Sequence, residues 1–403
     1  MSVAMAPTKL RRRGFDRGEV LVDLAVALAD GATSISDLAL LSDQPDLFGP
    51  VASVPTAWRT LAAMDQAALD RIAMARADAR RRAWQQGADP GFYVIDIDAT
   101  LVTAHSEKKG AAPTYKHGFG FHPVVSYLDA TGESLAAKLR PGNEAPGKAA
   151  DLVEVLDASL VQLPIDPRQA EVIVRADAAG CSHEFIDASQ ARGVRFCVGH
   201  ALSKDWAKAV LEAPDRAWVC AITADGADER DGAWVTEITD RVDLSGWPAG
   251  TRAIARREEA HPGAQLSFSD VDGHRYQVFI TDLAGDVVFC EALYRGRGRA
   301  ECAIRDSKDT GLGQLPSADF DINVAWVVLV MMAGDLLAWT RRICLQGELA
   351  RATPGRLRYT LLHTAGMIVR SARRTTLRIA QGWPWADQLV AAFTRLPNWS
   401  MVT

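Results

Sequence analysis

Seven regular segments follow one another between residues 92 and 198, and their order leaves few folds open. Three β-rich runs come first, and an amphipathic helix, a strand, a second helix and a final strand follow. The segments span 92–98, 122–128, 134–139, 148–163, 170–176, 183–192 and 194–198. Strands joined by short turns pair antiparallel, whereas strands separated by a helix run parallel. The order therefore predicts an α/β fold in which helices flank one mixed sheet.

This order is that of a ribonuclease-H-like core, in which three antiparallel strands precede the parallel part. Helical patterns lie on both sides of the core, and short strands between Gly, Asp and Pro turns interrupt it. In chain order we expect a helical domain at 1–90, the first part of the core at 91–203, a β-rich insertion at 204–291, the second part of the core at 292–340 and a basic helical region at 341–403.

The helical domain at 1–90 contains a pattern typical of DNA-binding proteins. Two short helical stretches and a turn precede a helix that opens at Ser53, with Pro55 in its first turn. Thr56 and Arg59 lie near the start of that helix, where a helix-turn-helix protein contacts bases. A plain helical bundle explains the same pattern, so both interpretations stand.

Charge is distributed unevenly along the chain. The 403 residues carry a net charge of −5, yet residues 336–403 hold ten arginines against Glu348 and Asp387, a balance of +8. The remaining residues therefore carry −13. A basic segment on an acidic body is typical of a protein that meets a polyanion such as DNA, and a solvated helical face is the alternative. The content of 48% apolar and 24% charged residues excludes a disordered chain.

Cysteines and apolar runs indicate the compartment. The six cysteines lie far apart and form no CxxC pair, which argues against a zinc site or disulfide scaffold and favours a reducing cytosol. No apolar core of signal-peptide type follows the basic residues 11–13. The longest apolar run, Val324 to Gly334, ends at Asp335 and is too short to span a membrane. We therefore expect a cytoplasmic protein with no membrane partner.

Aspartates end two of the predicted core strands. Asp98 lies at the end of the first strand, and Asp177 lies just past the fourth. These strands are neighbours in a ribonuclease-H-like sheet, so both carboxylates are expected at one edge. Two Mg²⁺ ions about 4 Å apart, held by carboxylates, can activate an attacking oxygen and stabilise a leaving oxygen. Asp96 shares a face with Asp98 and is a second candidate for the first ligand; strand-end aspartates also serve as turn residues.

Four polar residues further along the chain share one helix face. They are Tyr294, Arg297, Glu301 and Lys308. Their spacings of 3, 4 and 7 residues place them within an arc of about 60° on an α-helix. Gly296 and Gly298 weaken the start of that helix, so Tyr294 is expected on the incoming turn. A solvated face with ordinary ion pairs is the alternative.

The four residues match the Tyr-Arg-Glu-Lys signature of DDE transposases from bacterial insertion sequences, and the chain resembles that family along nearly its whole length. Asp98-Ala99-Thr100 resembles the family's first-aspartate segment, which favours Asp98 over Asp96, and residues 175–180 resemble its second. Further segments resemble one branch of these cut-and-paste enzymes, DDE domain group 1: residues 118–123, 139–143, 243–248 and 308–312.

The resemblance implies a role for each residue. Asp98, Asp177 and Glu301 would hold two Mg²⁺ ions, with Mn²⁺ as a substitute. Tyr294, Arg297 and Lys308 would bind phosphates next to the scissile bond. The implied activity is cleavage of double-stranded DNA at the terminal inverted repeats of the element, followed by joining to target DNA. A homo-oligomer on DNA, located in the cytoplasm at the nucleoid, is implied as well.

Two questions stay open. Some relatives carry a Trp directly after the Arg, where it stacks on an unpaired base, and this chain has Gly298 there. A DNA-hairpin step would then depend on a tryptophan such as Trp234 or Trp247, although packing in a β core is the expected role of both. The alternatives to a transposase are a metal-dependent nuclease that does not join, a non-catalytic DNA-binding relic, and a cytosolic enzyme unrelated to DNA. Retention of all three acids favours the transposase.

Overall fold

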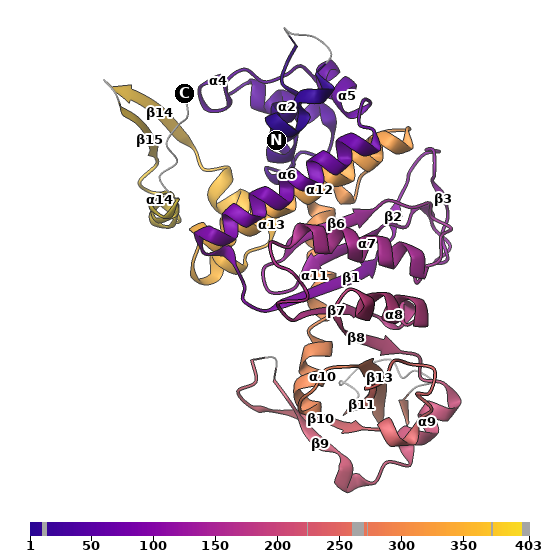
Figure 1. Cartoon of the computed structure of the whole chain (residues 1–403). Coiled ribbons are helices and arrows are strands. Elements are labelled where there is room, and N and C mark those ends of the chain that lie inside the picture. The colour runs from indigo at the N-terminus through magenta and orange to yellow at the C-terminus, as the bar shows by residue number, and fades with distance from the viewer. Residues whose placement is uncertain (10–13, 224, 260–269, 272, 372–373, 397–403) are drawn as a thin grey trace.

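A ten-stranded mixed sheet forms the centre of the computed structural model, which describes the chain apart from residues 10–13, 224, 260–269, 272, 372–373 and 397–403 (Figure 1). Its strands run in the order β6-β5-β1-β7-β8-β13-β11-β10-β9, and β12 pairs with β13 beside this path. The strands are β1 (Tyr93–Ala99), β5 (Val124–Leu128), β6 (Glu133–Lys138), β7 (Val172–Ala176), β8 (Arg195–His200), β9 (Val219–Ile222), β10 (Glu229–Glu237), β11 (Arg252–Glu259), β12 (Asp270–Val271) and β13 (His274–Thr281).

The first five strands of this sheet follow the predicted order. β1 pairs antiparallel with β5 and β5 with β6, whereas β7 runs parallel to β1 and β8 parallel to β7. Helices α7 (Ala149–Gln162) and α8 (His183–Ala191) connect these strands and cover the face to which Ile95 and Ile97 point. The prediction of a mixed α/β sheet flanked by helices is confirmed. A small sheet of β2 (Val102–Thr103), β3 (Ala112–Pro113) and β4 (Phe119–Phe121) was not predicted.

Residues 204–291 extend the main sheet instead of forming a separate one. After α9 (Lys204–Leu211), the strands β9, β10, β11 and β13 form an antiparallel ladder. β13 then pairs antiparallel with β8, from Val278 opposite His200 to Thr281 opposite Cys197. The junction covers the edge that β8 would otherwise leave unpaired. Strand partners so far apart in sequence leave no local signal, so the sequence predicted these strands but not their junction with the core.

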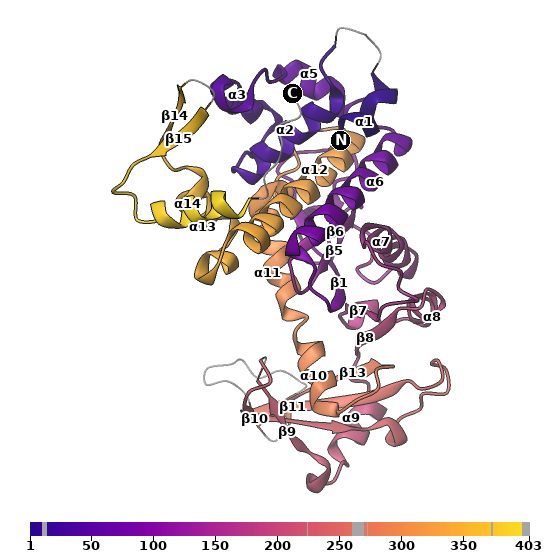
Figure 2. The same ribbon diagram turned by 60° about the vertical axis from the view of Figure 1, so that its left-hand side comes forward.

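Most of the remaining described chain is helical, and two helices carry the central part of the site. The longer helices are α2 (Arg17–Ala29), α5 (Val54–Leu61), α6 (Gln66–Ala83), α10 (Val287–Arg295), α11 (Gly298–Ser307), α12 (Phe320–Trp339) and α14 (Ala386–Arg395). Short helices are α1 (Ser2–Met5), α3 (Ala39–Ser42), α4 (Pro45–Phe48) and α13 (Pro354–Leu357). Figure 2 shows α10 and α11 following one another from the extended part of the sheet back to the core.

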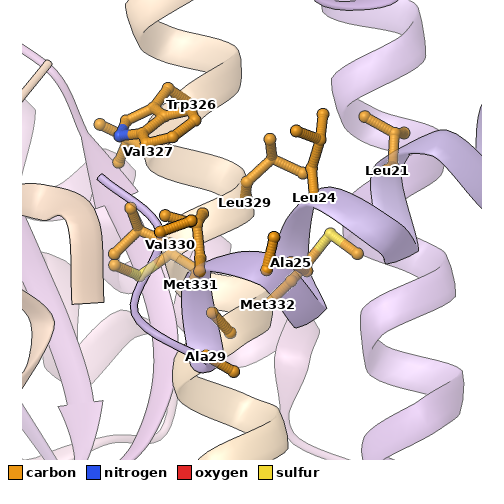
Figure 3. Close-up of a cluster of buried hydrophobic side chains, with 14 of the residues drawn as sticks. Leu21, Leu24, Ala25, Ala29, Trp326, Val327, Leu329, Val330, Met331 and Met332 are labelled. Atoms are coloured by element: carbon orange, nitrogen blue, oxygen red, sulfur yellow. The ribbon is translucent and has the colours of Figure 1, made fainter. Parts of the chain in front are cut away.

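The N-terminal helices share one hydrophobic core with α12. The cluster in Figure 3 joins residues of α2 to residues of α12: Leu21, Leu24, Ala25, Ala29, Trp326, Val327, Leu329, Val330, Met331 and Met332. Burial of each leucine, valine or methionine side chain contributes about 1.5–3 kcal/mol. The core thus crosses the expected boundary at residue 90, so residues 1–90 do not form a unit with a core of their own.

The apolar helix α12 is long and apolar enough, by length and composition alone, to cross a membrane. Its packing identifies it as a core helix, because most of its residues are buried against α2 and β6. Asp335 is also buried within it and pairs with Arg76 at 2.9 Å and Arg80 at 2.6 Å, both from α6. The residue that ends the apolar run in the sequence is therefore part of an internal ion-pair network.

The basic region at 341–403 is not helical throughout, which corrects that expectation. Strands β14 (Gly366–Ser371) and β15 (Arg374–Ile379) form an antiparallel ribbon that projects from the rest of the molecule (Figure 1). The cause lies in composition: Ile368, Val369, Thr375 and Thr376 are β-branched residues, which favour strands. The arginines between these residues leave no clear alternation of apolar and polar residues, so the sequence alone did not predict the strands.

Candidate active site

Asp98 and Asp177 lie side by side at the ends of two parallel strands. β1 and β7 pair in parallel with Asp96 opposite Arg175, and Asp98 and Asp177 each follow two residues further along the chain. The charge of Asp177 acts on Asp98. The Asp177 carboxylate also accepts hydrogen bonds from two backbone N–H groups of the turn that follows, at 3.0 and 3.3 Å. The parallel pairing of the strands fixes the backbone position of Asp98, and the turn fixes the position of the Asp177 carboxylate.

Arg297 lies at the centre of the site. Its Nη1 donates to Oδ2 of Asp98 at 3.2 Å, and its side chain is 21% exposed. Its charge also interacts with Tyr294, Asp177 and Glu301. The structure thus brings together five of the six residues that the sequence singled out, from β1, the end of β7, α10 and the start of α11.

Tyr294 lies on the last turn of α10, which corrects its expected place on an incoming turn. Asp286 accepts a hydrogen bond from a backbone N–H of the first turn at 3.0 Å, so α10 is established well before Gly296. Gly296 and Arg297 then join α10 to α11. The Tyr294 ring stacks on Phe279 of β13 with centroids 4.6 Å apart, which fixes the phenol against the sheet.

The site carries more negative than positive charge. Burial is the main cause that raises the pKa of Asp98 to about 6; Arg297 opposes this shift, and Asp177 and Glu301 add to it. Burial likewise raises the pKa of Tyr294 to about 12, so its hydroxyl stays protonated at neutral pH. Three carboxylates around one guanidinium leave the site short of positive charge.

This donor set fits a hard divalent cation, which prefers carboxylate oxygens. Glu301 is exposed and forms no hydrogen bond or ion pair with any residue that the structure describes, so both its oxygens are available. No three His, Cys, Asp or Glu side chains within the described ranges form a ready-made metal site. The Arg297 guanidinium already neutralises Asp98, so a metal ion that binds Asp98 has to compete with it.

Lys308 lies apart from the other five residues, at the end of α11. Its side chain is half-buried, and burial together with the charge of Lys116 lowers its pKa. Lys116 belongs to the loop between β3 and β4, with its Nζ 5.6 Å from the centre of the Tyr115 ring. Neither ammonium pairs with a carboxylate in the described part of the chain, and two such cations suit a phosphate. Sequence reasoning missed Lys116, because its loop has no periodic pattern.

Asp96 is held by Arg175 in a buried, bidentate ion pair. Nε and Nη2 of Arg175 donate to the two oxygens of Asp96, each at 2.7 Å, and the two residues are 0% and 2% exposed. Arg175 also contacts Asp129 at 2.9 Å. Both oxygens of Asp96 are therefore engaged, and this arrangement favours Asp98 as the first acid of the site. Sequence reasoning missed this role of Arg175, since a buried arginine has no sequence signal.

Gly199 of β8 is a further residue that sequence reasoning missed. A Cβ at this position would come within 2.3 Å of the Tyr294 hydroxyl oxygen and 2.8 Å of the Ala178 backbone nitrogen. The absence of a side chain therefore lets Tyr294 and the turn after Asp177 approach the strand. A glycine inside a strand is a signal of such close backbone approach.

Gly199→Ala is expected to lower the free energy of unfolding by about 1–3 kcal/mol, because the new methyl group overpacks the site. Tyr294→Phe in the same chain should recover part of the loss, since it removes the hydroxyl but leaves the backbone contact at Ala178. Urea denaturation of the two single variants and the double variant measures this coupling. Additive effects of the two substitutions would show that the hydroxyl does not meet position 199.

The tryptophans of the insertion pack against neighbouring side chains. The guanidinium of Arg257 lies 5.1 Å from the centre of the Trp234 ring, and the centroids of the His183 and Trp247 rings lie 4.1 Å apart. Both tryptophans thus have packing partners, as expected for residues of a β core.

The start of α11 faces open space at Gly298, because a Cβ at this position would meet no atom within 4 Å.

Comparison with known proteins identifies a family that matches this chain. The family model described as transposase DDE domain group 1 matches residues 3–401. Among solved structures, the chain is similar to the cryo-EM structure of the piggyBac transposase synaptic complex with hairpin DNA, at 10% sequence identity and a TM-score of 0.44. That alignment covers 89% of this chain and 75% of the other. No curated protein matches the chain.

Proposed function

The chain belongs to the transposase DDE domain group 1 family, and we propose that it cuts double-stranded DNA at the terminal inverted repeats of an insertion sequence and joins the freed ends to target DNA. The observation that supports this proposal is the ion pair between Arg297 and Asp98, with the charges of Asp177 and Glu301 acting on both residues. Such a site suits phosphoryl transfer, in which positioning and charge neutralisation supply most of the acceleration.

The acids are proposed to hold metal. Asp98, Asp177 and Glu301 would hold two Mg²⁺ ions, for which Mn²⁺ can substitute. When bound, such ions activate the attacking oxygen and neutralise the leaving oxygen. The chain contributes the positions of the carboxylates: two strand ends fix Asp98 and Asp177, and the first turn of α11 presents Glu301 on the exposed side.

The cations and the phenol are proposed to hold the DNA backbone. Arg297 uses one nitrogen on Asp98, and its other N–H groups are suited to bidentate contact with a phosphate. The Tyr294 hydroxyl is a protonated donor held against Gly199. Lys308, with Lys116 nearby, supplies point charges for a neighbouring phosphate. These groups orient the scissile bond without forming a covalent bond to it.

The remaining parts of the proposal concern assembly and sequence recognition. The N-terminal helices, with half-buried Thr56 and exposed Arg59 on α5, are proposed to read the terminal repeat in the major groove. A homo-oligomer would hold two element ends together, in the cytoplasm at the nucleoid. Because the N-terminal helices share a core with α12, their role is best tested by point substitution, not by deletion.

The test is cleavage of a labelled duplex that carries the inverted repeat flanking the gene. Incubation with Mg²⁺ should cut at the repeat boundary, whereas EDTA, or a duplex with a scrambled repeat, should leave the DNA intact. Addition of a supercoiled plasmid should yield a covalent product between the labelled end and the plasmid. Cleavage without joining would identify a nuclease. A chain that neither cuts nor joins with Mg²⁺ or Mn²⁺ overturns the proposed function.

A further inference from the structure

The ribbon of β14 and β15 is not used by the chemistry proposed above. Residues 349–386, which include it, contain seven arginines and no acidic residue. Most of its described side chains are exposed, and Met367 and Leu377 are 62% and 43% exposed. An isolated two-stranded hairpin is marginally stable in water. A ribbon with this exposure therefore depends on contacts beyond its own strand pairing.

The two faces of the ribbon have different surroundings. Residues directly opposite each other on paired strands share a face, so Met367 and Arg378 lie on one face and Arg370 lies on the other. Arg370 pairs with Asp46 of α4 at 3.4 Å, which turns its face toward the N-terminal helices. Arg378 is exposed and has no carboxylate partner among the described residues. Arg370 is therefore already engaged by a carboxylate, whereas Arg378 is available to bind an anion.

The base of the ribbon is held by an aromatic cluster. The rings of Tyr359, Trp383 and Trp385 contact one another edge-on, with centroids 5.4 to 5.9 Å apart. Nε1 of Trp383 also donates to the Thr360 carbonyl at 2.9 Å. Figure 2 shows the ribbon extending from this part of the chain alongside the N-terminal helices. The ribbon is thus anchored at its base and beside α4.

We propose that the Arg378 face of this ribbon lies in a groove of duplex DNA next to the N-terminal helices. This inference rests on the proposed function, in which double-stranded DNA is the substrate. The major groove of B-DNA admits a two-stranded ribbon, and Arg378, Thr376 and Ser371 offer donors to phosphate oxygens on one face. A ribbon so rich in arginine would repel the same ribbon of a second copy, so its charge favours DNA over pairing with itself.

The experiment measures the affinity of the full chain for a labelled duplex, without metal and over a range of salt concentrations. Arg378→Ala should weaken binding roughly five- to tenfold and reduce the slope of log K against log salt by about 1, as expected for one lost phosphate contact. Arg378→Lys should keep most of the slope. Arg216→Ala, which removes an exposed arginine from the far end of the molecule, should change the affinity less than about twofold.

A crosslinking pair tests which face is involved. A benzophenone side chain at Thr376, on the face of Arg378, should crosslink to DNA more strongly than one at Thr375, on the face of Arg370. Unchanged affinity and slope in Arg378→Ala overturn the proposal. A shift in oligomeric state with unchanged DNA binding does so as well, and assigns the ribbon to a protein partner. If the native chain binds through the ribbon but never cuts, the proposed function fails and the ribbon proposal stands.

Discussion

Glu301→Gln is expected to slow metal-dependent cleavage of terminal-repeat DNA by about a thousandfold or more and to leave DNA binding intact. The substitution keeps the shape of the side chain and removes its charge. Loss of metal-based charge stabilisation worth several kcal/mol corresponds to at least that factor in rate. Because Glu301 is exposed and pairs with no described residue, its removal should not destabilise the fold. Single-turnover cleavage, fluorescence anisotropy and thermal unfolding measure the three quantities.

The matched control is Glu184→Gln. Glu184 is also an exposed glutamate in the first turn of a helix that packs on the same sheet, and it lies outside the site. The same chemical change there should alter the cleavage rate less than about twofold, since surface substitutions are usually near neutral. Equal cleavage rates for Glu301→Gln and the native chain would remove Glu301 from the proposed metal site.

The central pair of the site could be predicted because its geometry follows from local order. β1 and β6 both pair antiparallel with β5 and so run in the same direction, and helix α7 between β6 and β7 makes β7 parallel to β1. In parallel neighbours the residues after each strand lie at one edge. The expected proximity of Asp98 and Asp177 follows from this rule alone. The helix spacing also placed Arg297 and Glu301 together, although the break at Gly296 separates Tyr294 on α10 from Glu301 on α11.

The rest depends on contacts that no local pattern encodes. Asp96 and Asp98 look alike in the sequence, and only the neighbouring strand shows that Arg175 engages Asp96. The core between α2 and α12 joins segments some 300 residues apart, so each apolar face predicts burial but not its partner. The ribbon of β14 and β15 was missed because a strand exposed on both faces lacks the alternation of apolar and polar residues that identifies strands.

Asp335→Asn is expected to lower the free energy of unfolding by about 3–5 kcal/mol, because it leaves a buried positive charge without a partner. Asp335 is 1% exposed and accepts from Arg76 at 2.9 Å and from Arg80 at 2.6 Å. Arg80 also pairs with Glu133 at 3.0 Å. Two arginines and two acids balance one another in the native network, and the substitution breaks that balance. Urea denaturation followed by tryptophan fluorescence measures the change.

The fluorescence readout is well placed, since Trp84 and Trp339 donate to Glu133 at 3.2 and 2.6 Å. Asp78→Asn is the matched control, because Asp78 pairs with Arg81 on the same helix α6 but both side chains are more than half exposed. Exposed pairs of this kind contribute about 0–1 kcal/mol.

We expect the loss of stability in Asp335→Asn to come from broken charge balance and not from the loss of one hydrogen bond. Adding Arg76→Met to Asp335→Asn leaves Arg80 against Glu133 and restores neutrality, so the double variant should be more stable than Asp335→Asn alone. Methionine also keeps most of the buried volume of Arg76. If the double variant is instead less stable by the sum of the two single losses, the arginines stabilise the core through separate hydrogen bonds, and the network does not act as one charge-balanced unit.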